Sequence, residues 1–72
     1  MKSRSYWQDA IYQRLDKLLS HRAVVDYDYA MNMLRAERYR AYPFDGPWSF
    51  NPSDTTLRRW VRRWLSERYG SL

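Results

Sequence analysis

Residues 57–65 constrain the fold of this chain more strongly than any other segment. In a helix of about 3.6 residues per turn, the apolar side chains of this segment fall on one stripe. That stripe comprises Leu57, Trp60, Val61, Trp64 and Leu65. The cations fall on the other side, and they are Arg58, Arg59, Arg62 and Arg63. The pattern predicts an amphipathic helix with an aromatic side that enters a core and a cationic side that faces solvent or a partner.

The chain is short, and it must build its core largely from aromatic side chains. Its 72 residues are expected to form one domain over residues 1–72 and to hide only about 60% of the unfolded surface. There is no cysteine, so neither a disulfide nor a thiolate metal site can stabilise the fold. The chain has instead four Trp, seven Tyr and two Phe, and each ring can bury on the order of 150–250 Å².

A first helix is expected over about residues 5–19. Ser5 with Gln8 three residues later fits a capping box, which is typical of a helix start. Apolar side chains then recur at a spacing of about one turn and form a single stripe. They are Trp7, Ile11, Leu15, Leu18 and Leu19.

A second helix is expected over about residues 23–41, and it has two apolar stripes. The first stripe comprises Ala23, Tyr27, Ala30, Met31 and Leu34. The second comprises Val25, Tyr29, Met33 and Ala36. A helix that is apolar on two sides is typical of a central helix, packed between two others. A contact between the second stripe and a partner is the other interpretation, and both stay open at this point.

Residues 42–53 are expected to form an ordered aromatic loop. Three prolines and one glycine break the helical pattern, and Pro43 disfavours helix in the residue before it. The aromatic residues of the loop are too apolar for a free linker, so we expect the loop to fold over the helix ends. Ser53 or Asp54 then caps a third helix over about residues 54–69, and Gly70 ends it.

These elements predict an all-α fold: a compact three-helix domain with an ordered aromatic, proline-containing loop between helices 2 and 3. The alternative is a helical hairpin that completes its core by dimerising.

The sequence offers no residue set for catalysis. His21 is the only histidine, there is no cysteine, and the two glycines cannot form a phosphate-binding loop. Asp26 and Asp28 diverge by about 200° on a helix, so they cannot chelate a metal together, and they suit the positive end of the helix dipole. We therefore expect a non-enzymatic protein with no catalytic residue, no metal and no cofactor.

The first functional hypothesis is a small protein-binding module, an accessory or inhibitory and regulatory protein that acts on a larger protein or nucleoprotein complex. Trp, Tyr and Arg are the residue types enriched at interface hot spots. The candidate partner-binding residues are Tyr29, Met33, Trp48, Phe50, Arg58, Arg59, Arg62 and Arg63. Trp48 fits a core position as well as an interface, and both stay open. The expected partner is a protein with an acidic patch, and a homodimer is the alternative.

Two other hypotheses follow from the charge. Thirteen Lys and Arg against eight Asp and Glu give a net charge of +5. This excess favours nucleic-acid binding through the Arg face of residues 57–65 as the second hypothesis. The third is attachment of that amphipathic helix to a membrane surface. No signal peptide and no apolar run of membrane-spanning length is visible, so we expect a cytoplasmic protein.

Overall fold

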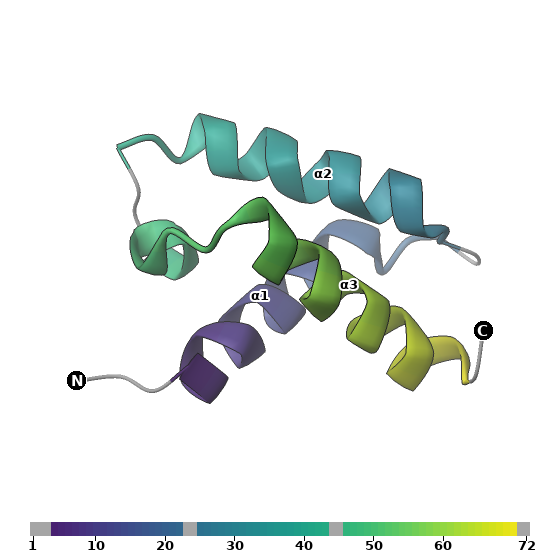
Figure 1. The fold of residues 1–72 in the computed structure, drawn as a ribbon. Helices are drawn as coiled ribbons and strands as arrows, with labels where there is room; N and C mark the ends of the chain where they lie inside the picture. Colours follow the sequence, from purple (N-terminus) through teal and green to yellow (C-terminus); the bar gives the residue numbers. More distant parts are fainter. Residues whose placement is uncertain (1–3, 23–24, 44–45, 71–72) are drawn as a thin grey trace.

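Three α-helices and one short 3₁₀-helix make up the fold of the chain. The computed structural model describes residues 4–22, 25–43 and 46–70. The helices are α1 (Arg4–Leu19), α2 (Tyr27–Arg40) and α3 (Asp54–Tyr69), and the 3₁₀-helix η1 (Gly46–Phe50) lies between α2 and α3. In Figure 1, α2 lies across one side of α1 and α3, and η1 lies near the C-terminal end of α2. The prediction of an all-α, three-helix fold with an ordered aromatic loop is confirmed.

Side-chain caps define where α2 and α3 begin. The Asp26 side chain accepts a hydrogen bond of 2.7 Å from the backbone N–H of Tyr29, and its backbone is extended. Hence α2 begins at Tyr27, later than the predicted residue 23; residues 23 and 24 lie outside the described residues. Ser53 caps α3 by accepting a hydrogen bond of 3.2 Å from the Thr56 N–H.

The first helix starts differently from the prediction. It begins at Arg4, so Ser5 lies inside the helix and not at its N-cap. The Gln8 side-chain amide donates to the Tyr12 hydroxyl at 2.9 Å, one turn further along α1. The predicted capping box is therefore wrong.

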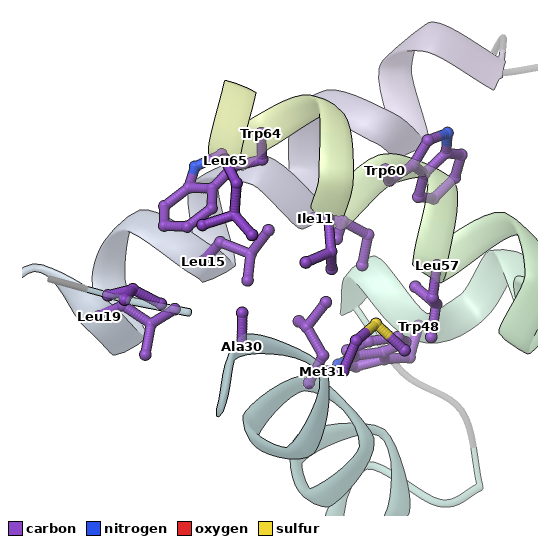
Figure 2. Close-up of a cluster of buried hydrophobic side chains, with 13 residues drawn as sticks. Ile11, Leu15, Leu19, Ala30, Met31, Trp48, Leu57, Trp60, Trp64 and Leu65 are labelled. Atoms are coloured by element: carbon purple, nitrogen blue, oxygen red, sulfur yellow. The ribbon is translucent and has the colours of Figure 1, made fainter. Parts of the chain in front are cut away.

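The core lies where the three helices and η1 meet, and Figure 2 shows most of its side chains. The apolar stripe of α3 lies in this core, and Trp60 and Trp64 are each only 4% exposed. The buried residues of the whole core are Ile11, Leu15, Leu19, Val25, Ala30, Met31, Leu34, Trp48, Leu57, Trp60, Val61, Trp64 and Leu65. Each helix contributes to one cluster, so the described fold is the three-helix domain and not the two-helix hairpin.

The aromatic loop packs on the helices through two side chains of η1. Trp48 is 1% exposed and belongs to the core. Phe50 stacks between Trp7 of α1 and Trp60 of α3, with ring centroids 5.9 and 6.3 Å apart. The loop thus joins α1 to α3, and its rings supply apolar area that a chain of this length could not otherwise bury.

Replacement of Trp48 by Ala tests this account of the core. Because the indole is buried, Trp48→Ala is expected to destabilise the protein by about 3–5 kcal/mol. The single core of a chain this short rarely supplies more than about 3–5 kcal/mol, so much of the variant should be unfolded at 37 °C. Urea denaturation followed by circular dichroism measures the change. Tyr39→Ala is the control, since Tyr39 is 85% exposed and its loss should alter stability by less than about 0.5 kcal/mol. Equal midpoints for the two variants would contradict the burial of Trp48.

Candidate protein-binding surface

The candidate partner-binding residues of the sequence do not form one patch in the structure. Trp48 is buried, so its assignment to a partner contact is corrected: the indole fills the core. Phe50 is 40% exposed, and its ring stacks on Trp7 and Trp60. Tyr29 and Met33 are partly buried against the core, and the Arg22 guanidinium lies 4.1 Å from the Tyr29 ring centroid. The apolar candidates thus contribute mainly to packing.

The four arginines of α3 point to different neighbours. Arg62 and Arg58 lie on the edge that faces α2: the Arg62 guanidinium lies 5.0 Å from the ring centroid of Tyr27, and Arg58 lies 3.9 Å from Asp54. Arg59 is exposed next to them. Each of these three arginines lines a shallow hollow with Thr55. Arg58, Arg59 and Arg62 therefore make this edge of α3 strongly cationic.

Arg63 follows Arg59 by one turn of α3, and its charge acts on Tyr12 of α1. Burial raises the pKa of the Tyr12 hydroxyl on α1, and the charges of Glu67 and Arg63 also act on it, in opposite directions. Arg63 itself lies 3.9 Å from Glu67, one turn further along α3. Arg63 thus lies beside Arg59 but does not line the hollow that Arg58, Arg59 and Arg62 form.

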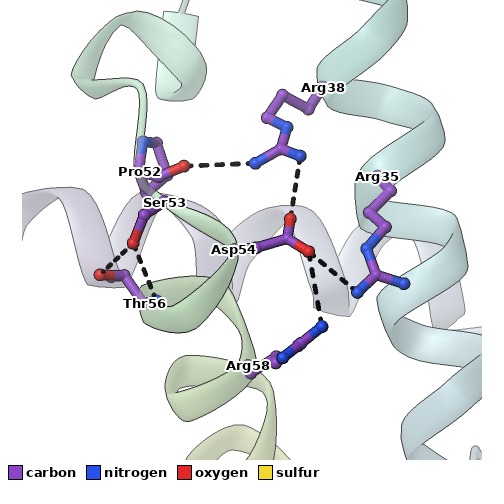
Figure 3. Close-up of polar contacts among 7 residues, drawn as sticks. All are labelled: Arg35, Arg38, Pro52, Ser53, Asp54, Thr56 and Arg58. Atoms are coloured by element: carbon purple, nitrogen blue, oxygen red, sulfur yellow. Dashed lines mark hydrogen bonds and ion pairs between the residues drawn. The ribbon is translucent and has the colours of Figure 1, made fainter.

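Asp54 links α3 to two further arginines on α2. Its carboxylate accepts hydrogen bonds of 3.0 Å from both Arg35 and Arg38, and Arg38 also donates to the Pro52 carbonyl at 3.3 Å. Figure 3 shows the carboxylate pointing toward these two side chains of α2, with Arg58 on its other side. The hydrogen bonds from Arg35 and Arg38 hold the pKa of Asp54 below its usual value of 3.8. As the first residue of α3, Asp54 also suits the positive end of the helix dipole.

A second hollow lies on the α2 side of Asp54. Arg35 and Arg38 line it together with two tyrosines at the end of α2, and its volume is about 690 Å³. Tyr39 is 85% exposed and Tyr42 is 74% exposed. Because Asp54 contacts arginines of both hollows, it marks the centre of a continuous candidate site.

We call this site the arginine–tyrosine surface. It comprises Arg35, Arg38, Tyr39, Tyr42, Asp54, Thr55, Arg58, Arg59 and Arg62. Five arginines and one aspartate give it a net charge of +4, so most of the chain's net charge of +5 is concentrated here.

Sequence reasoning found only part of this surface. It selected Arg58, Arg59 and Arg62 but missed the residues of α2. The missed signal is the spacing of Arg35, Arg38, Tyr39 and Tyr42, which recur at positions i, i+3, i+4 and i+7 and so share one helix side. The contact of Arg38 and Arg35 with Asp54, 16 and 19 residues away, is visible only in the fold.

Comparisons of the chain with protein-family models, with curated proteins and with solved structures find no match. Within the described residues, no three His, Cys, Asp or Glu side chains form a group that could hold a metal ion. Among the described helices, none has the length and apolar character needed to cross a membrane.

The ion pairs of Asp54 predict an acid-sensitive contribution to stability. Since the folded pKa lies below the unfolded value of 3.8, the contribution of Asp54 is present above that value and is lost as pH falls through the folded pKa. At pH 7, Asp54→Asn should cost no more than about 1 kcal/mol, because the carboxylate is partly exposed. Urea denaturation between pH 7 and pH 2 should show the two proteins converging at the acid end.

Glu67→Gln is the control for Asp54→Asn, since it removes the same charge from an exposed pair with a single partner at 3.9 Å. A gap between wild type and Asp54→Asn that stays constant down to pH 2 would contradict the assigned ion pairs.

Proposed function

We propose that this chain is a non-enzymatic protein-binding module, an accessory or regulatory protein that binds an acidic patch on a larger protein through its arginine–tyrosine surface. The observation that supports this most is the combination of a net charge of +4 with two largely exposed tyrosines on one surface. Arg and Tyr are enriched at interface hot spots, where each ring supplies contact area and each guanidinium pairs with a carboxylate.

The arginines of α2 support the proposal because Asp54 already orders them. Each guanidinium has five N–H donors, and the hydrogen bonds to Asp54 and Pro52 use only a few of them. A side chain that is ordered before binding loses less conformational entropy in the complex. Arg35 and Arg38 can therefore donate to partner carboxylates at a lower entropic cost than free arginines.

Nucleic-acid binding is the alternative, and the hollow lined by Thr55, Arg58, Arg59 and Arg62 favours it. Its three arginines have one carboxylate nearby, that of Asp54, which lies 3.9 Å from Arg58. The hollow is therefore cationic, and arginine pairs well with the phosphates of a nucleic acid. Asp54 and the exposed tyrosines favour a protein partner instead, since a continuous phosphate backbone would place negative charge against Asp54.

Burial of the apolar stripe of α3 argues against the membrane-surface hypothesis. It requires the apolar stripe of α3 to enter a lipid layer, and Leu57, Trp60 and Trp64 are buried in the core.

The test uses three single variants of similar exposure and different position. The tagged protein is incubated with nuclease-treated lysate of the source cells, and recovered proteins are identified by mass spectrometry. The dissociation constant of the purified partner is then measured for each variant. Tyr39→Ala and Arg59→Ser should each weaken binding by about thirtyfold, because a hot-spot residue contributes about 2 kcal/mol. Arg63→Ser should weaken binding much less than Arg59→Ser, because Arg63 lines neither hollow and has Glu67 beside it.

The same variants identify the alternative. Three results together would identify nucleic acid as the ligand. A duplex DNA oligonucleotide would bind more tightly than any recovered protein, Arg59→Ser and Arg63→Ser would weaken its binding equally, and its affinity would fall steeply with salt. Equal loss from Arg59→Ser and Arg63→Ser on a protein partner would contradict the arginine–tyrosine surface as the site.

A further inference from the structure

The larger hollow of the arginine–tyrosine surface lies along one side of α2. Its volume is about 690 Å³, and Arg35, Arg38, Tyr39 and Tyr42 line it. The Tyr42 N–H donates to the Tyr39 carbonyl at 3.4 Å, which continues the helical side past the last residue of α2. Both tyrosines are largely exposed, so a ligand in the hollow reaches their rings.

The two arginines of the hollow keep hydrogen-bond donors for a ligand. Arg35 donates to Asp54 through Nη2, and Arg38 donates to Asp54 through Nη2 and to the Pro52 carbonyl through Nη1. None of the described hydrogen bonds uses the Nε–H of either guanidinium. The side chains of Arg35 and Arg38 are 38% and 25% exposed. The hollow thus combines accessible aromatic rings with cations that can still donate.

The chemistry of these walls limits which ligands fit. A cation suits the tyrosine rings but is repelled by the two guanidinium groups. A carboxylate alone leaves the rings uncovered, and the hollow has the volume of a ligand site, about 300–1,000 Å³, far more than one carboxylate fills. A neutral hydroxyl or a water molecule forms a weaker hydrogen bond to arginine than an anion does.

A ring without charge fits only half of the hollow. It covers the tyrosines, but it displaces water from guanidinium N–H groups and offers them no acceptor. A ring joined to an anionic group meets both requirements, since the ring packs on a tyrosine and the anion accepts from an arginine.

We propose that this hollow binds an aromatic side chain of the protein partner that has a carboxylate on a neighbouring residue, as in a Phe flanked by Glu. The ring packs against Tyr39, and the carboxylate accepts hydrogen bonds from Arg35 or Arg38. This inference rests on the proposed protein-binding function and names the side chains by which the partner is recognised.

Three capped tripeptides test the proposal at constant ionic strength: acetyl-Glu-Phe-Glu-amide, acetyl-Glu-Ala-Glu-amide and acetyl-Gln-Phe-Gln-amide. The readout is the saturable shift of the backbone amide resonances of α2 in the ¹⁵N-labelled protein. The first peptide has both ring and charge, so it should bind at least about tenfold more tightly than either of the others. Equal binding of the second or the third peptide, or no saturable shift with any of them, overturns the proposal.

A pair of variants tests whether the ring packs on Tyr39. In Tyr39→Ala, the advantage of the acidic Phe peptide over the acidic Ala peptide should disappear. In Tyr6→Ala, which removes a partly exposed ring that contacts Trp7 on α1, that advantage should stay intact. Equal loss of the advantage in the two variants would overturn the proposal.

Adenosine monophosphate is the probe for a nucleotide, since it also joins a ring to an anion. Tighter binding of adenosine monophosphate than of the acidic Phe peptide would overturn the assignment to a protein side chain. A recovered protein partner that Arg59→Ser weakens, together with no preference among the peptides, overturns this inference alone. Failure to recover any protein overturns the proposed function, whichever peptide binds.

Discussion

The fold depends on the insertion of Trp48 into the core from a 3₁₀-helix of five residues. Three short helices without a disulfide bury little surface, and the indole fills the volume that they leave between them. Phe50, two residues later, stacks on Trp7 and Trp60 and holds η1 against α1 and α3. The loop is therefore a fourth packing element, and its position also sets where α3 begins.

The start of α3 determines the candidate binding surface. Because the loop ends at the Ser53 cap, Asp54 lies opposite the last turns of α2 and meets Arg35 and Arg38. The same geometry places Arg62 over the Tyr27 ring at the other end of α2, so the two helices run in opposite directions along a seam of arginines. Core packing and surface charge are thus two consequences of one loop conformation.

Helical periodicity makes the three-helix fold predictable, because the local spacing of apolar residues indicates which side of each helix is buried. The start of α2 is harder to predict from the sequence. Val25 extends the apolar pattern and so places Asp26 inside the predicted helix, whereas Asp26 is its N-cap. Trp48 could not be assigned from sequence, since a ring flanked by prolines suits a core or an interface equally. The α2 half of the arginine–tyrosine surface depends on the contact between residues 35–38 and Asp54, and no local pattern encodes it.

The position of Asp54 within five arginines also constrains the shape of a ligand. In the proposed complex, a partner carboxylate gains hydrogen bonds from Arg35 and Arg38 or from Arg59 and Arg62, on either side of Asp54, and the Asp54 carboxylate repels it. Complementarity therefore requires two separated groups of negative charge with a neutral gap between them. Folded proteins present carboxylates in such discrete positions, whereas a nucleic-acid backbone carries a charge at every step. Asp54 thus orders Arg35 and Arg38, and its charge is the physical reason why the proposed partner is a protein with discrete carboxylates and not a uniform polyanion.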